Sequence, residues 1–182
     1  MQNRYFILHR LVHWATALLV LGLLAAGLLF IFVGHDGLKT ILGEQLTSSI
    51  YTYHKAFGIV VLGLALVGVF FRVLFGTPDY DPPLSAIFRV PSGWVQALMY
   101  MILVAMPLIG WAGSNAAGHP VQVFDHLMPT LVGQDKLLAE KLFWMHGLLG
   151  WVLMGLVAIH ILAALLHAKI LRDKVTERMS LF

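Results

Sequence analysis

The chain has 182 residues, of which 59% are hydrophobic and 12% are charged, whereas a soluble domain of this size carries about a quarter of charged residues. This composition excludes an ordinary soluble domain and indicates a protein surrounded by membrane lipid. The net charge is +3 with no run of Lys or Arg, which argues against a nucleic-acid partner, and the cysteine count of zero excludes disulfides, iron–sulfur clusters and thiolate ligands.

The first apolar segment predicts a membrane-spanning helix over residues 8–33. A helix needs about 20 apolar residues to cross the hydrocarbon core of a bilayer. Arg4 and Arg10 precede the apolar run, as they would in a signal peptide, but the run from Leu11 to Val33 is 23 residues long. The apolar region of a signal peptide has about 7–15 residues, so we expect this helix to be retained.

Three further apolar segments are long enough to span a bilayer, over residues 53–75, 94–113 and 142–168. Residues 114–141 form the longest connection, and a short basic tail follows at 169–182. We therefore expect an all-α protein with one domain over residues 1–182, folded as a transmembrane four-helix bundle.

Lys and Arg residues are unevenly distributed between the two ends of this bundle. Four spans place both termini on one side, together with the connection between the second and third spans. That side carries eight Lys and Arg residues and the other side carries four. Because the more basic side of a membrane protein faces the cytoplasm, we expect both termini to be cytoplasmic.

Four histidines lie within the expected spans: His13, His54, His146 and His160. An ionisable side chain in hydrocarbon is costly and usually marks a functional site. His146 and His160 are 14 residues apart, close to four helical turns, so they share one helix face at depths about 21 Å apart.

Each of these two histidines has a partner at its own depth. His54 begins the second span at the level of His146, and His13 lies near the cytoplasmic start of the first span, at the level of His160. Two facing imidazoles suit the axial positions of haem iron, whereas a bare metal ion requires three or four protein ligands. The pattern predicts two haems stacked across the membrane, one between each pair.

Other interpretations of these histidines are possible. Each of them could be a hydrogen-bonded structural residue. A proton relay would also use histidines, but it would be expected to include Asp or Glu within the spans, and the spans contain neither. His9 lies one turn before His13 on the same face and competes with it as a ligand.

Several segments together resemble the bacterial cytochrome b561 family. They are His13-Trp14, His54, Met106-Pro107-Leu108-Ile109-Gly110, the Ser114–Val121 stretch, and the series His146, His160 and His167. The resemblance implies a quinone-linked electron carrier of the bacterial inner membrane, with two haem b groups on His13, His54, His146 and His160.

Within that family the chain is most similar to members that pass electrons from superoxide, at the outer face, to ubiquinone. We therefore expect a superoxide:ubiquinone oxidoreductase. An alternative is a cytochrome b subunit that carries electrons from a periplasmic dehydrogenase, hydrogenase or other redox protein to the quinone pool. A third possibility, from another class, is a haem-free metal or proton transporter.

Two residues at the cytoplasmic end are candidates for the catalytic site of quinone reduction. His167 is seven residues after His160, and the resemblance favours it as a donor of hydrogen bonds and protons to the quinone. It could instead be an interfacial residue. Arg72 shares a helix face with His54 and could hold a propionate of the inner haem or polarise a quinone oxygen, or simply anchor the helix end.

Four residues at the outer end are candidates for binding the propionates of the outer haem. Ser114 and Asn115 would donate hydrogen bonds, and Lys55 and Lys141 would act by charge. These lysines, together with Lys39, could also attract superoxide locally.

Overall fold

A computed structural model of the chain describes residues 4–80 and 83–181. Its four long helices are α1 (Ile7–Phe32), α3 (Glu44–Phe75), α4 (Ala86–Ala116) and α5 (Lys136–Leu165). By length and composition all four can cross a membrane. The expected transmembrane four-helix bundle is therefore confirmed. The expected domain and tail also include residues 1–3 and 182, which lie outside the described residues.

The shorter elements connect or follow the long helices. They are the helix α2 (Gly34–Leu42), the strands β1 (Gln122–Val123) and β2 (His126–Leu127), the π-helical segment η1 (Leu166–Leu171) and the 3-10 helix η2 (Val175–Met179). The strands pair antiparallel as a small hairpin between α4 and α5.

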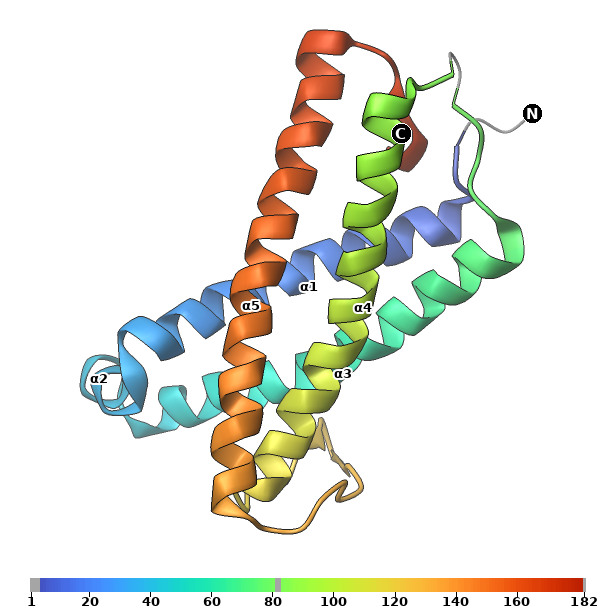
Figure 1. The fold of residues 1–182 in the computed structure, drawn as a ribbon. Coiled ribbons are helices and arrows are strands. Elements are labelled where there is room, and N and C mark those ends of the chain that lie inside the picture. The colour runs from blue at the N-terminus through green and yellow to red at the C-terminus, as the bar shows by residue number, and fades with distance from the viewer. Residues whose placement is uncertain (1–3, 81–82, 182) are drawn as a thin grey trace.

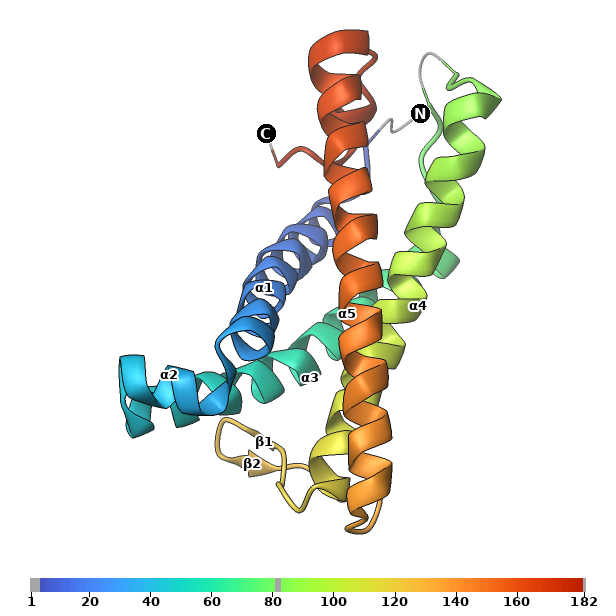
Figure 2. The same cartoon turned by 60° about the vertical axis from the view of Figure 1, so that its left-hand side comes forward.

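The bundle consists of two helix pairs that cross obliquely. α1 packs against α3, and α4 packs against α5, with α3 and α4 also in contact. Figure 1 shows the α4–α5 pair in front of the α1–α3 pair, and the turned view in Figure 2 shows the two pairs diverging. Because α5 also contacts α1, groups on α5 can meet partners from both helices of the other pair.

The two ends of the bundle differ in the elements that they hold. One end, called here the terminal end, holds both chain termini (Figure 2), and the backbone N–H of Tyr5 donates to the carbonyl of Arg178 there. The opposite end holds α2 and the β1–β2 hairpin and is called the hairpin end. Both termini thus lie on one side, as the four expected spans require.

The buried core is small and lies where the four long helices meet. It comprises Val20, Val61, Ala65, Ile102, Leu103 and Leu153. Large apolar side chains elsewhere point outward, among them Leu18, Phe32 and Val73 with exposed fractions of 70%, 73% and 81%. A surface this apolar is suited to lipid rather than to water.

The long helices extend beyond the segments that hydropathy predicts. α3 begins at Glu44 rather than at 53, α4 covers 86–116 rather than 94–113, and α5 begins at Lys136 rather than at 142. These boundary predictions were too short because the added turns of α3 and α5 contain charged and polar residues, and because the added first turns of α4 contain Pro91. The tail forms the short helix η2, and the hydrogen bond from Tyr5 to Arg178 joins it to the start of the chain.

Candidate cofactor site

The first pair of histidines lies toward the hairpin end. His54 extends from α3 and His146 from α5, and their ring centres are 6.2 Å apart with the ring planes at 69°. We call them the hairpin-side pair. Both side chains are half-buried among the helices.

The second pair lies toward the terminal end and has the same geometry. His13 of α1 faces His160 of α5, with ring centres 6.2 Å apart and planes at 68°. We call them the terminal-side pair. Since His146 and His160 lie on the continuous helix α5, one helix supplies a histidine to each pair at two depths.

The ring separation fits one metal ion between each pair. Two metal–imidazole bonds of about 2.0–2.1 Å, with about 1.1 Å from each nitrogen to its ring centre, separate the ring centres by about 6.3 Å. Within residues 4–80 and 83–181, no cluster of three or more His, Cys, Asp or Glu side chains is placed to hold a metal ion. A macrocycle such as haem, which brings its own equatorial nitrogens, therefore fits these sites better than a bare ion.

The ring of His146 is held by its neighbours on α4. Its Nδ1 donates a hydrogen bond of 3.0 Å to the carbonyl of Met106. Because a carbonyl only accepts, this bond places the proton on Nδ1 and leaves Nε2 free to bind a metal. A Cβ atom at Gly110 would lie 2.9 Å from Nδ1 and Cε1 of His146, so only glycine allows this approach.

The hairpin-side pair borders a cavity and includes a buried ring nitrogen without a hydrogen-bond partner among the described residues. The Nδ1 atom of His54 is buried and has no hydrogen-bond partner in the described part of the chain. A cavity between the four long helices borders both rings, and a Cβ added at Gly58, on its wall, would meet nothing within 4 Å. The remaining lining is apolar: Val20, Leu23, Leu24, Val61, Leu103, Met106, Pro107 and Leu153.

His9 does not take the place of His13. It is almost fully buried, 2% exposed, among the rings of Tyr5, Phe6 and Phe71. The ring that faces His160 is that of His13.

The two candidates at the terminal end contact different partners. Arg72 donates a 2.8 Å hydrogen bond to Oε1 of Gln96 and so links α3 to α4. His167 is the second residue of η1 and is 7% exposed, and its Nδ1 lies 2.5 Å from Oδ2 of Asp173. No sequence pattern singles out Asp173, because it follows the end of the last span and belongs to the basic tail.

Three of the four candidates for binding the propionates of the outer haem form hydrogen bonds to the connection between α4 and α5. Ser114 Oγ donates to the carbonyl of His119, and Asn115 Oδ1 accepts from the N–H of Leu131. Both residues lie in the last turns of α4 rather than in a loop, and both are buried. These contacts position the connection itself, and binding of a haem propionate by the two residues stays a prediction.

The two lysines of that group are closer to the surface. Lys55 Nζ donates a 3.1 Å hydrogen bond to the carbonyl of Pro120, and Lys141 is exposed on the first turns of α5. Lys39, which was expected to assist them, forms an exposed ion pair with Glu44.

Comparison with known proteins places nearly the whole chain in one family. The model of the family described as prokaryotic cytochrome b561 matches residues 4–180. Cytochrome b561 homolog 2 of Escherichia coli K12 is 27% identical over 179 residues, which cover 97% of this chain and 91% of that protein. The probable superoxide oxidase CybB of Yersinia pestis is 26% identical over 179 residues, which cover 98% and 97% of the two chains.

Proposed function

Because the chain belongs to the prokaryotic cytochrome b561 family, whose members are haem b proteins, we propose that it is a dihaem membrane cytochrome that carries electrons from superoxide to ubiquinone. His54 and His146 would hold one haem, and His13 and His160 the other. The repetition of one ring separation, 6.2 Å, at two depths of the bundle carries this proposal.

When bound, haem supplies one-electron redox chemistry, and the protein's task is to hold and insulate it. The bond from His146 to Met106 fixes the free nitrogen of the ring, and Gly110 provides room for it. The apolar walls around the hairpin-side pair exclude water. Each pair would offer two protein ligands to one haem iron.

Superoxide is the donor that we propose for the hairpin end. The relative named a probable superoxide oxidase aligns with nearly all of this chain. Lys55 and Lys141 bring positive charge to that end, which favours the approach of a small anion. Each superoxide would lose one electron to become dioxygen.

Ubiquinone is the acceptor that we propose for the terminal end, near His167 and Arg72. Two electrons and two protons convert one ubiquinone to ubiquinol, so two superoxide ions are consumed for each quinone. The proposed location is the bacterial inner membrane with the terminal end in the cytoplasm, because this end carries more Lys and Arg.

Stopped-flow spectroscopy on the purified protein tests this function. Superoxide alone should reduce the haem iron, as followed by the haem absorbance after mixing. Added ubiquinone-1 should then reoxidise the haem iron with formation of ubiquinol. Haem that is reduced only after a periplasmic dehydrogenase or hydrogenase is added would favour the electron-relay subunit instead. A purified protein with no b-type spectrum would overturn both functions.

A further inference from the structure

A buried imidazole–carboxylate pair lies at the terminal end, beyond the two histidine pairs. Nδ1 of His167 lies 2.5 Å from Oδ2 of Asp173, and the side chains are 8% and 21% exposed. The second carboxylate oxygen, Oδ1, accepts a 3.2 Å hydrogen bond from the N–H of Val175. Both oxygens of Asp173 are thus engaged, which fixes the carboxylate against the ring.

The backbone on both sides of Asp173 is bent in a way that ordinary residues avoid. Arg172 and Lys174 have φ angles of 51° and 61°, in the left-handed region that is unfavourable for non-glycine residues. Just before this turn the chain forms the π-helical segment η1, which contains His167. These features bring Asp173 back onto a side chain six residues earlier.

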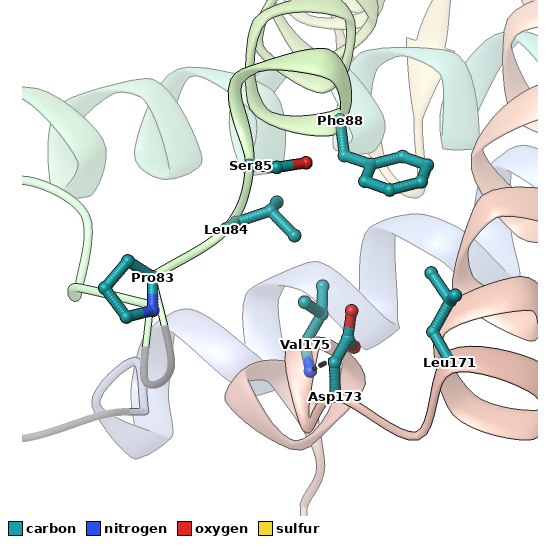
Figure 3. Close-up of a pocket in the computed structure, with 7 residues that line it drawn as sticks. All are labelled: Pro83, Leu84, Ser85, Phe88, Leu171, Asp173 and Val175. Atoms are coloured by element: carbon teal, nitrogen blue, oxygen red, sulfur yellow. Dashed lines mark hydrogen bonds between the residues drawn. The ribbon is translucent and has the colours of Figure 1, made fainter.

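A cavity of about 280 Å³ lies beside this pair. Asp173 is on its wall, opposite Phe88 and Ser85 of the first part of α4, as Figure 3 shows. The remaining walls are mostly apolar: Pro83, Leu84, Leu171 and Val175. The imidazole of His167 lies behind this wall, because its ring packs edge-on against that of Phe88 at 5.3 Å and its Nδ1 contacts Asp173.

An apolar cavity of this size with one polar corner suits a single flat ring that carries carbonyl oxygens. Quinone reduction ends with two new O–H bonds, so a group beside the ring must donate protons. When Asp173 accepts the Nδ1–H of His167, the proton-exchanging nitrogen of that imidazole is Nε2.

We propose that Asp173 is the positioning residue of quinone reduction: from the wall of this cavity it fixes the orientation and tautomer of His167 beside a quinone head group that occupies the cavity. The proposal rests on the proposed function. Each quinone takes up two electrons from the haem side and two protons through this end of the protein, and is thereby reduced to the quinol.

Three variants test the proposal in the haem-loaded protein. Asp173→Ala removes the acceptor for the Nδ1–H. Asp173→Asn keeps an oxygen that can accept the same bond. Glu177→Ala is the matched control, because Glu177 is an exposed acid on the same tail. For each variant, we would measure haem content, the rate of haem reduction by superoxide, and kcat and KM for formation of ubiquinol-1. Histidine-labelled protein would report the ring tautomer by ¹⁵N NMR.

We expect Asp173→Ala to lower kcat for quinol formation about tenfold or more, with normal haem content and normal reduction by superoxide. Asp173→Asn should retain most of the rate and the Nδ1–H tautomer, and Glu177→Ala should match the wild type. An unchanged kcat in Asp173→Ala, or equal losses in both Asp173 variants, would overturn the positioning role. If Asp173→Ala does not fold, the retained rate and tautomer in Asp173→Asn decide the question. A wild-type protein that forms no quinol refutes the proposed function and this inference together, whereas an active wild type with unaffected variants refutes the inference alone.

Discussion

The two histidine pairs have the same ring separation, but different parts of the chain support them. At the hairpin-side pair, His146 is held by Met106 and Gly110 of α4, and His54 packs against the ring of Phe30 at 5.1 Å. All of these supports lie within the long helices.

The terminal-side pair is supported from the tail. The ring of Trp14 packs against His13 at 5.5 Å, and its Nε1 donates a 2.8 Å hydrogen bond to the carbonyl of Met179. Arg10, one turn earlier on α1, donates to the carbonyl of Ser180. The same ring separation is therefore supported in two ways: one pair depends on packing between the long helices, and the other depends on a segment that follows the last span.

The largest expected effect is the selective loss of one haem when a ligand is removed. His54→Ala or His146→Ala should empty the hairpin-side site, while His13→Ala or His160→Ala should empty the terminal-side site. Haem content per chain would fall by about half in each case, and the remaining signal in electron paramagnetic resonance would be the same for the two members of a pair. Variants that each keep both haems would show that the pairing is wrong.

A smaller effect is expected for Gly110→Ala. The new Cβ would lie 2.9 Å from the ring of His146, a contact that forces the imidazole to move. Displacing a ligand in this way should weaken haem binding at the hairpin-side site about 10- to 100-fold and leave the other site unchanged, as measured by haem retention during dilution.

Gly155→Ala is the control for this substitution, because Gly155 is on α5 and a Cβ there would meet nothing within 4 Å. Equal haem retention in the Gly110 and Gly155 variants would remove the role given to Gly110.

The smallest effect concerns the tail. Arg178 is 8% exposed, its guanidinium lies 3.8 Å from the ring centre of Tyr80 and 5.4 Å from that of Tyr5, and it donates to the carbonyl of Pro78. Burial raises the pKa of the Tyr5 phenol, so this ring stays neutral beside the cation. Arg178→Ala should lower the free energy of unfolding by about 1–3 kcal/mol, and this loss should lower the melting temperature by several degrees.

On heating, this variant should lose the terminal-side haem before the hairpin-side haem. Lys169→Ala, which changes an exposed residue of η1 at the same end, should melt like the wild type. Simultaneous release of both haems from Arg178→Ala would contradict the proposed difference between the two sites.

The features that the sequence predicted are those governed by simple periodicity. Four apolar runs of sufficient length became the four long helices, and the 14-residue interval placed His146 and His160 on one face of α5. The expected depths of the histidines also predicted that His54 faces His146 and that His13 faces His160. Their role as haem ligands stays a prediction.

The features that it did not predict depend on contacts between distant segments. α2 and the polar first turns of α3 carry no apolar signal. The hydrogen bonds of Ser114 Oγ and Asn115 Oδ1 to the backbone of the connection that follows α4 were not predicted either, because their partners His119 and Leu131 are brought there by the fold of that connection. The approach of Asp173 to His167 requires two left-handed residues, which no residue pattern indicates.

The number of haems bound per chain decides whether both histidine pairs are haem sites. A pyridine haemochrome assay of the purified protein, combined with amino-acid analysis for its concentration, gives the ratio. Two b-type haems per chain are expected, because each histidine pair would supply two protein ligands to one iron. A ratio of one or zero would contradict the assignment of two sites.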